Sequence, residues 1–218
     1  MRYSLVIFDL DGTILNTLED LADSLNAALE KSGYPGRTME EVRRFVGNGI
    51  RKLIERAVPQ GTEKECVDQV HRDFTEHYKV HCADRTRPYD GILDLLADLK
   101  EKGLRTAVVS NKADYGVQEL CSRYFEGLFD LAVGEREGIL RKPAPDSVNE
   151  VLQRLQVRRE DAVYIGDSEV DIQTAKNAGM DHIIVDWGFR EAEYLKEQGA
   201  KVMVSRPEEI GKIVCSAE

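Results

Sequence analysis

The chain has 218 residues, of which 42% are hydrophobic, and a formal net charge of −10 from 40 acidic and 30 basic residues. That much apolar sequence is sufficient for a folded core and excludes a largely disordered chain. The acidic balance argues against nucleic acid and anionic membranes as main partners, because both favour a basic face. A small anionic substrate needs only a local cluster of positive groups.

The first predicted element is a short apolar strand, Leu5–Phe8, of the kind found inside a parallel sheet. It runs directly into two carboxylates, Asp9 and Asp11, and Gly12 then lets the chain turn. Like charges at the end of a buried strand are unfavourable unless something positive lies between them. The stretch is therefore interpreted either as ordinary turn residues or as a cation site with a carboxylate nucleophile.

From about Thr17 to Asp84 the sequence shows only helical periodicity. A first helix is expected to begin at Thr17 and to end at Gly33, and two capping-box patterns, Thr38–Glu41 and Thr62–Glu65, indicate further helix starts. This segment is too long for an ordinary connection inside a sheet domain, so it predicts a separate helical subdomain.

The domain organisation follows from this insertion. We expect residues 16–85 to form an all-helical cap, with hinges near Asn16 and near Arg85–Tyr89. Residues 1–15 and 86–218 are then expected to form the catalytic core.

After the helical segment, short apolar runs alternate with helical patterns. The expected strands are Thr106–Val109, Leu128–Val133, Ala162–Ile165, Ile183–Val185 and Lys201–Val204. The expected helices are Asp90–Lys102, Asp146–Leu155 and Asp171–Ala178. This alternation predicts an α/β fold with a doubly wound, Rossmann-like parallel sheet that carries helices on both faces.

The cysteines and the apolar runs indicate the compartment. The four cysteines are far apart in the sequence, which favours reduced thiols over a disulfide framework or a zinc site. No apolar run approaches the length of a membrane span, and the stretch after Arg2 is too short for a signal peptide because it ends at Asp9. We therefore expect a cytoplasmic protein, monomeric or homodimeric, that binds neither nucleic acid nor a membrane.

The side chains suited to chemistry lie mostly where a predicted strand ends. Ser110 and Asn111 follow the second strand, Asp167 and Asp171 follow the fourth, and Lys142 lies between the third and the fourth. Ligands of open parallel sheets bind outside the carboxyl ends of the strands. We therefore expect these groups to converge there with the carboxylates that follow the first strand.

Such a set of groups fits phosphoryl transfer. Magnesium prefers oxygen ligands and is usually held by one or two carboxylates and a substrate phosphate. Asp9 and Asp167 are the expected ligands, with a backbone carbonyl near Asp11. One carboxylate can attack phosphorus while a second acid exchanges protons with the leaving oxygen and with water. Ser110 can bind phosphate oxygens, and Lys142 can neutralise charge on the transferring group.

Four segments, in this order, resemble the four motifs of the haloacid dehalogenase superfamily of hydrolases. They are Asp9–Thr13, Ser110–Lys112, Lys142–Pro143, and Gly166–Ser168 with Asp171. The resemblance spans nearly the whole chain. It implies a parallel α/β core with a mobile helical cap.

The resemblance also implies roles for single residues. Asp9 matches the family's nucleophile, and Asp11 matches the general acid/base, whose backbone carbonyl also binds magnesium. The match to Ser110 binds phosphate, and the match to Lys142 steadies the nucleophile and the phosphate.

Two further matches concern the metal. Asp167 matches a magnesium ligand, and Asp171 matches an acidic residue that supports the metal shell, in some members through water. Considered without the other motifs, Asp171 fits the role of an acidic residue at a helix start nearly as well as it fits a role beside the metal.

Within the superfamily the chain looks most like the phosphoglycolate phosphatase branch, because Phe45–Gly49 resembles that branch's glycine-containing cap loop. Gly47, Asn48 and Arg51 are therefore candidate substrate contacts, although the loop can equally be a plain connection between helices. That branch more often has Asp-Ser where this chain has Asn16-Thr17, a departure that bears on substrate choice more than on chemistry.

The function expected from the sequence is a magnesium-dependent phosphatase that acts on a small phosphorylated metabolite through an aspartyl-phosphate. A sugar phosphomutase resembling β-phosphoglucomutase and a pyrophosphatase are alternatives on the same fold. A dehalogenase is disfavoured, because that reaction needs neither the second acid, Asp11, nor the metal ligand Asp167.

Overall fold

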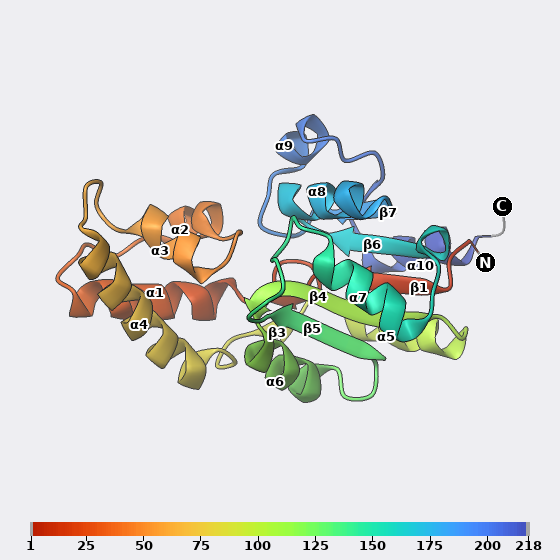
Figure 1. Ribbon diagram of the computed structural model, residues 1–218, viewed down its shortest axis with the longest axis horizontal. Coiled ribbons are helices and arrows are strands. Elements are labelled where there is room, and N and C mark those ends of the chain that lie inside the picture. Colours follow the sequence, from red (N-terminus) through yellow and green to blue (C-terminus); the bar gives the residue numbers. More distant parts are fainter. Residues whose placement is uncertain (1, 217–218) are drawn as a thin grey trace. The chain divides into compact units, whose positions relative to one another are not determined.

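Six parallel strands form one sheet in the computed structural model, which describes residues 2–216 (Figure 1). In chain order they are β1 (Leu5–Phe8), β4 (Arg105–Ala113), β5 (Leu131–Glu135), β6 (Ala162–Gly166), β7 (Asp181–Val185) and β8 (Met203–Val204). The spatial order is β5-β4-β1-β6-β7-β8, so the chain winds from β1 first to one side and then to the other. This arrangement confirms the predicted doubly wound α/β fold.

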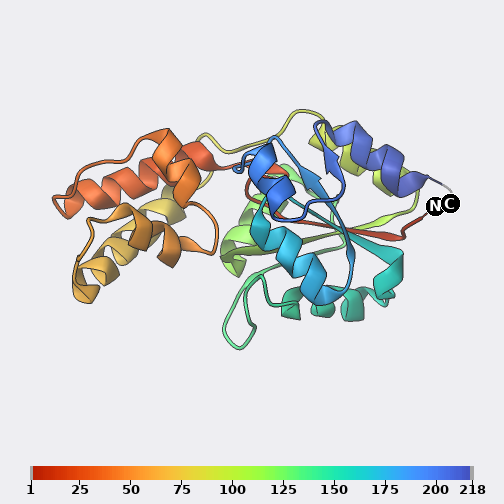
Figure 2. The ribbon, with the colours of Figure 1, turned by 90° about the horizontal axis from the view of Figure 1, so that it is seen from above.

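The helices connect these strands on both faces of the sheet. They are α5 (Ile92–Glu101), α6 (Asp114–Tyr124), α7 (Asp146–Leu155), α8 (Glu169–Ala178), α9 (Ala192–Glu197) and α10 (Pro207–Cys215), with a 3₁₀ turn at Arg159–Asp161. Figure 2 shows α7 and α8 on one side of the sheet and the packed pair α5 and α10 on the other.

Strand β1 is apolar throughout because both of its faces are covered. Leu5 pairs with Arg105 of β4 and with Ala162 of β6, and all four residues of β1 are fully buried. Leu5 and Ile7 point to the face where α7 and α8 pack. A strand held from both sides fixes the position of whatever follows it, and here that is Asp9.

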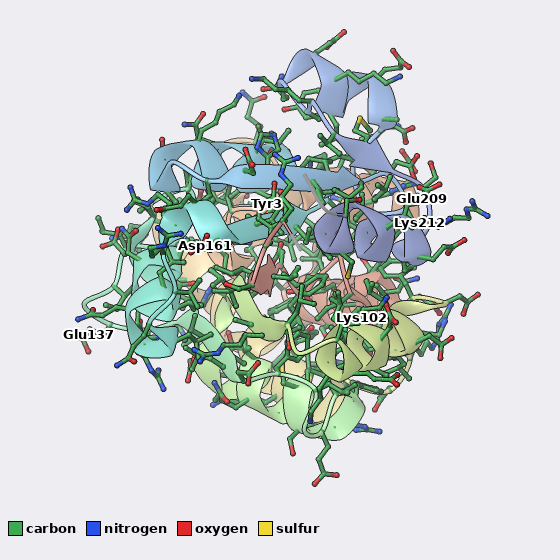
Figure 3. The ribbon with its side chains drawn as sticks, turned by 90° about the vertical axis from the view of Figure 1, so that its right-hand side faces the viewer. Tyr3, Lys102, Glu137, Asp161, Glu209 and Lys212 are labelled. Atoms are coloured by element: carbon green, nitrogen blue, oxygen red, sulfur yellow. The ribbon has the colours of Figure 1, made fainter. Side chains whose placement is uncertain are left out.

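At the amino ends of the strands, Tyr3 and Asp161 lie near the start of β1 (Figure 3). There the Ser4 amide donates a hydrogen bond of 2.7 Å to the Asp161 carbonyl, and the Tyr3 hydroxyl donates one of 2.7 Å to Asp181. Burial and the neighbouring Asp181 raise the pKa of Tyr3 to about 12. These contacts therefore tie the residues before β1 to the residue before β6 and to the start of β7.

Two strands differ from their predicted bounds for local reasons. Strand β4 continues to Ala113, with a break in register after Val109, so Ser110 and Asn111 lie within it. Strand β5 begins at Leu131 and not at Leu128, because the Leu128 amide donates a hydrogen bond to the Phe125 carbonyl in the turn after α6.

The chain divides into two compact units, Met1–Leu15 with Pro88–Glu218, and Asn16–Arg87. Two short strands, β2 (Leu15–Asn16) and β3 (Arg87–Pro88), pair where the chain passes from one unit to the other.

The smaller unit is all-helical. Its helices are α1 (Leu18–Lys31), α2 (Met39–Phe45), α3 (Ile50–Ala57) and α4 (Lys64–His81). Helices α1 and α4 run antiparallel: His77 of α4 contacts Ser24 at 3.0 Å, and Asp73, one turn earlier in α4, pairs with Lys31 further along α1.

Of the two predicted capping boxes, only the first is formed. The Thr38 hydroxyl accepts a hydrogen bond from the Glu41 amide at 3.2 Å, and the Glu41 carboxylate accepts one from the Thr38 amide at 2.8 Å. The second prediction is wrong, because the Thr62 hydroxyl donates to the Pro59 carbonyl at 2.7 Å, and α4 begins after Glu63 without a side-chain cap.

Within residues 2–216, no helix combines the length and the apolarity needed to cross a membrane.

Candidate active site

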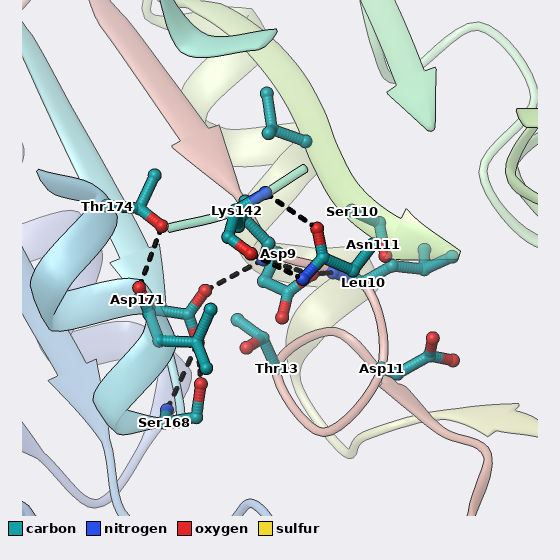
Figure 4. A network of polar contacts seen from close by, with 12 residues as sticks. Asp9, Leu10, Asp11, Thr13, Ser110, Asn111, Lys142, Ser168, Asp171 and Thr174 are labelled. Atoms are coloured by element: carbon teal, nitrogen blue, oxygen red, sulfur yellow. Dashed lines mark hydrogen bonds and ion pairs between the residues drawn. The ribbon is translucent and has the colours of Figure 1, made fainter. Parts of the chain in front are cut away.

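Three aspartates from two segments of the larger unit, those that follow β1 and β6, meet at the carboxyl end of β1. Asp9, Asp167 and Asp171 each offer a carboxylate oxygen within 4.8 Å of the others, and we call them the acidic cluster. Figure 4 shows Asp9, Lys142 and Asp171 gathered there, with Asp11 to one side. The structure thus brings together groups that follow β1 and β6 with Lys142.

Lys142 joins the cluster from the loop before α7. Its Nζ lies 2.9 Å from Asp9 Oδ1 and 2.8 Å from Asp171 Oδ1, and the side chain is only 3% exposed. Burial alone would lower the pKa of Lys142, but the carboxylates of Asp171 and Asp9 outweigh it and raise that pKa well above its usual value. The lysine is therefore a fixed positive charge beside Asp9.

Asp9 is oriented by two donors on one oxygen. Its Oδ1 accepts a hydrogen bond from the Leu10 amide at 2.7 Å as well as the contact from Lys142. Burial, with the nearby carboxylates of Asp171 and Asp167, raises the pKa of Asp9 to about 8 despite the opposing effect of Lys142. The positive charge of Lys142 is therefore too small to balance the negative charge of the three clustered carboxylates.

Asp167 follows β6 and is held on both oxygens. The Thr13 hydroxyl donates to Oδ1 at 3.0 Å, and the Phe189 amide donates to Oδ2 at 2.8 Å. Burial and the Asp171 carboxylate raise the pKa of Asp167 to about 7.

Glycines leave the space that the aspartates occupy. A Cβ on Gly12 would lie 2.4 Å from Asp167 Oδ2, and one on Gly166 would lie 2.3 Å from the Cβ of Asp171. Neither space admits a side chain. Gly12, which also has a φ of 85°, is therefore required for close approach as well as for the turn.

Asp171 is the most enclosed member, and protein donors surround it. Its Oδ2 accepts from the amides of Asp167 and Ser168, at 3.2 and 3.1 Å, and from the Ser168 hydroxyl at 2.6 Å. Its Oδ1 accepts from Lys142. We predicted a metal role for Asp171, and these contacts favour a different one, in which it holds Lys142 and the turn after β6.

Tyr164 is a further partner of Lys142 that the sequence analysis did not identify. The Tyr164 hydroxyl accepts a hydrogen bond of 3.0 Å from Lys142 Nζ and lies 3.2 Å from the Val109 carbonyl. A tyrosine inside the buried run of β6 was a usable signal, because a buried hydroxyl normally needs a polar partner.

Asn111 makes contacts other than those predicted for it. Its side-chain amide donates to the Lys142 carbonyl at 3.0 Å and accepts from the Lys142 amide at 2.8 Å. These two bonds clamp the backbone of Lys142, whereas we predicted that Asn111 binds substrate. Ser110 is 5% exposed beside it, and its hydroxyl accepts from the Lys112 amide at 3.3 Å.

Asp11 does not belong to the acidic cluster. Its carboxylate lies 3.2 Å from Nζ of Lys112, a lysine that is itself buried. We expected Asp11 to contribute a backbone carbonyl to the metal and its carboxylate to proton transfer. The carboxylate expected to transfer protons is therefore the group that pairs with Lys112.

Of the three candidate substrate contacts of the helical unit, Gly47 and Asn48 lie in the loop before α3, and Arg51 lies within α3. Gly47, Asn48 and Gly49 have φ angles of 109°, 63° and 84°, so three consecutive residues have a positive φ. Arg51 pairs with Glu55 at 3.0 Å and also with Asp68. These ion pairs engage its guanidinium inside the unit, which weakens the expectation that it binds a substrate carboxylate.

The donor set fits a magnesium ion. Magnesium takes carboxylate and carbonyl oxygens, and the cluster presents Asp9 and Asp167, whose pKa values are raised by burial and by the neighbouring carboxylates. Asp9, Asp167 and the backbone carbonyl of Asp11 are the groups that would hold it.

Comparisons with known proteins agree with this geometry. A family model described as haloacid dehalogenase-like hydrolase matches residues 6–185. The chain is 32% identical to a phosphoglycolate phosphatase from Aquifex aeolicus (strain VF5), over 96% of this chain and 95% of that protein. It is 30% identical to an N-acetylmuramic acid 6-phosphate phosphatase from Pseudomonas aeruginosa, over 96% of this chain and 94% of that protein.

A solved structure is similar along its whole length. A crystal structure from Lactobacillus delbrueckii subsp. bulgaricus, named provisionally as a phosphoglycolate phosphatase, matches with a TM-score of 0.95 and 40% identity, and the match covers 100% of both chains. The likeness therefore includes the helical unit as well as the sheet.

Proposed function

We propose that this chain, which belongs to the haloacid dehalogenase-like hydrolase family and is a phosphatase, hydrolyses a small phosphorylated metabolite with magnesium and through an aspartyl-phosphate on Asp9. The observation that carries the proposal is the contact of Lys142 with Asp9 inside the acidic cluster. A buried carboxylate with one oxygen fixed by a cation is oriented for nucleophilic attack.

The reaction has two steps. A carboxylate oxygen of Asp9 attacks phosphorus, the bond from phosphorus to the ester oxygen breaks, and that oxygen takes a proton from Asp11. Water then attacks phosphorus and gives a proton to Asp11, the bond to Asp9 breaks, and inorganic phosphate leaves. Lys142 stabilises negative charge on the phosphoryl oxygens in both steps.

Magnesium would be held by Asp9, Asp167 and the Asp11 carbonyl. When bound, it neutralises the acidic cluster and the phosphate, so that two anionic groups can meet. Asp171 keeps Lys142 in place, and the Ser110 hydroxyl is the candidate phosphate contact.

The substrate class rests on the relatives. One is named for phosphoglycolate and another, at similar identity, for N-acetylmuramic acid 6-phosphate, so we propose a small phosphorylated acid or sugar, with phosphoglycolate as the first candidate. Because both relatives are named for phosphate monoesters, hydrolysis of a phosphate monoester is preferred over the phosphomutase and pyrophosphatase alternatives. The helical unit is proposed to act as a cap that selects the substrate, with Gly47 and Asn48 in its loop.

A phosphate-release assay tests the proposal. The purified protein is given phosphoglycolate, N-acetylmuramic acid 6-phosphate and other sugar phosphates, with magnesium and then with a chelator. We expect magnesium-dependent release of phosphate that falls by at least about 1,000-fold in Asp9→Asn. Activity that survives both chelation and this substitution would contradict the mechanism.

A further inference from the structure

A loop that follows β7 encloses Asp167 and has no role in the mechanism above. It consists of Trp187, Gly188, Phe189 and Arg190, and we call it the Trp187–Arg190 loop. We propose that this loop is a positioning element that fixes the Asp167 carboxylate in the orientation needed to bind a divalent cation. The inference rests on the proposed function, because it assumes that Asp167 is a magnesium ligand.

The first line of evidence is the hydrogen bonding of Asp167. The Phe189 amide donates to Oδ2 at 2.8 Å, and the Thr13 hydroxyl donates to Oδ1 at 3.0 Å. Each carboxylate oxygen has two lone pairs, so one donor on each oxygen fixes the plane of the group and leaves capacity for a cation. Asp167 is 2% exposed, so bulk water does not replace these donors.

The second line of evidence is steric. A Cβ placed on Gly188 would lie 2.3 Å from the Cβ of Asp167 and 2.4 Å from its Oδ2. The loop backbone therefore lies directly against the aspartate, and only glycine permits that approach. Any side chain there must displace either the loop or the carboxylate.

The third line of evidence is that the loop is anchored at both of its ends. Trp187 Nε1 donates to the Thr13 carbonyl at 3.0 Å, so the loop holds the residue whose hydroxyl bonds Asp167. At the other end, Arg190 pairs with Glu169 at 2.9 Å, and their side chains are 12% and 25% exposed. Glu169 is the first residue of α8, two positions after Asp167.

These contacts form a closed arrangement around one carboxylate. Changes to groups that hydrogen-bond a metal ligand and hold it in place commonly alter metal affinity by about 10- to 100-fold. A loop that only packs against the sheet would instead affect stability and leave metal affinity unchanged. The two roles can therefore be separated by measurement.

The test uses two variants and one control in the full-length protein. Gly188→Ala introduces the clashing Cβ, and Trp187→Phe removes the donor to Thr13 while it keeps an aromatic ring. Gly211→Ala is the matched control, because its Cβ would meet ordinary contacts of 3.5 and 3.6 Å. Magnesium affinity is measured by isothermal titration calorimetry, and the melting temperature is measured with a chelator and with magnesium.

We expect magnesium affinity to fall about 10-fold or more in Gly188→Ala, about 3-fold or more in Trp187→Phe, and not at all in Gly211→Ala. Melting temperatures that fall with unchanged magnesium affinity would overturn the inference. Trp187→Phe decides the question if Gly188→Ala does not fold. Wild-type protein that binds no magnesium would overturn the proposed metal and this inference together, whereas normal wild-type binding with unaffected variants overturns only the role of the loop.

Discussion

Lys142 is the residue on which the contacts of the candidate site converge. Its Nζ contacts Asp9, Asp171 and the Tyr164 hydroxyl, and all of these lie in the interior of the larger unit. A buried ammonium group is tolerated only when charged and polar partners surround it, so these contacts are mutually dependent. The same contacts aim the charge at Asp9.

Tyr164 provides the first prediction. We expect Tyr164→Phe to lower kcat by about threefold to tenfold, because Lys142 loses one hydrogen-bond partner worth about 1 kcal/mol and its Nζ becomes less well oriented. The unchanged aromatic ring should preserve packing and KM. Steady-state kinetics with the preferred phosphate ester measures both, and a kcat equal to that of the wild type would show that the hydroxyl does not orient Lys142.

At the scale of elements, the irregular end of β4 connects two segments of the site. The register breaks after Val109, and Asn111 then clamps the Lys142 backbone through two hydrogen bonds. The clamp therefore joins the irregular end of β4 to the loop before α7.

The clamp gives a prediction that separates positioning from substrate binding. Asn111→Ala should lower kcat about 10- to 100-fold with little change in KM, because the displaced Lys142 stabilises charge that develops in the transition state, whereas the proposed phosphate contact of Ser110 remains. Asn26→Ala is the matched control, since Asn26 makes the same two-bond clamp on Arg37 in the helical unit. A raised KM with normal kcat would instead favour the substrate role first predicted for Asn111.

The loop before α3 gives a prediction about specificity. Asn48 has a φ of 63°, which glycine adopts without strain, so Asn48→Gly removes the side chain and keeps the loop conformation. We expect kcat/KM to fall about tenfold for the preferred metabolite and to change little for a generic aryl phosphate. Gln156→Gly, at another residue with positive φ, is the control. Equal losses on both substrates would contradict a selective role for this loop.

At the scale of the whole molecule, we expect the acidic cluster to make folding stability depend on pH and on the proposed magnesium ion. Burial raises the pKa of Asp9 from 3.8 to about 8 and that of Asp167 from 3.8 to about 7. Between a pH of 3.8 and these raised pKa values, Asp9 and Asp167 keep their protons in the metal-free folded state, whereas the unfolded state has released them. The stabilisation is therefore complete below about pH 4 and is lost as the pH rises through 7 to 8.

Magnesium should reverse this trend. Because the cation binds the ionised carboxylates, its affinity rises with pH up to about 8, and bound cation stabilises the folded state. We expect the rise in melting temperature on adding magnesium to be larger at pH 8 than at pH 6. Asp167→Asn should reduce both the pH dependence of the metal-free protein and the magnesium effect. A magnesium effect of equal size at both pH values would contradict the assigned pKa shifts.

The fold and the cluster were predictable because their signals are local. Apolar runs such as Leu5–Phe8 alternate with helical periods, and in a parallel sheet the carboxyl ends of strands meet at one edge. This rule brought Asp9 and Asp167 together from the sequence, whereas Lys142 was assigned from its place between two predicted strands and from the family resemblance. The long helical segment after Asn16 was also predictable from the sequence, because it interrupts the alternation of strands and helices.

Only the tertiary structure decided how each group is used. That Asn111 clamps a backbone, that Asp171 holds Lys142, and that Asp11 pairs with Lys112 all depend on side-chain contacts between segments distant in sequence. Residue type and spacing specify which groups reach an edge of the sheet, but hydrogen-bond partners depend on packing at the scale of single ångströms. For the same reason the close approach of Gly188 to Asp167 carries no signal in the sequence.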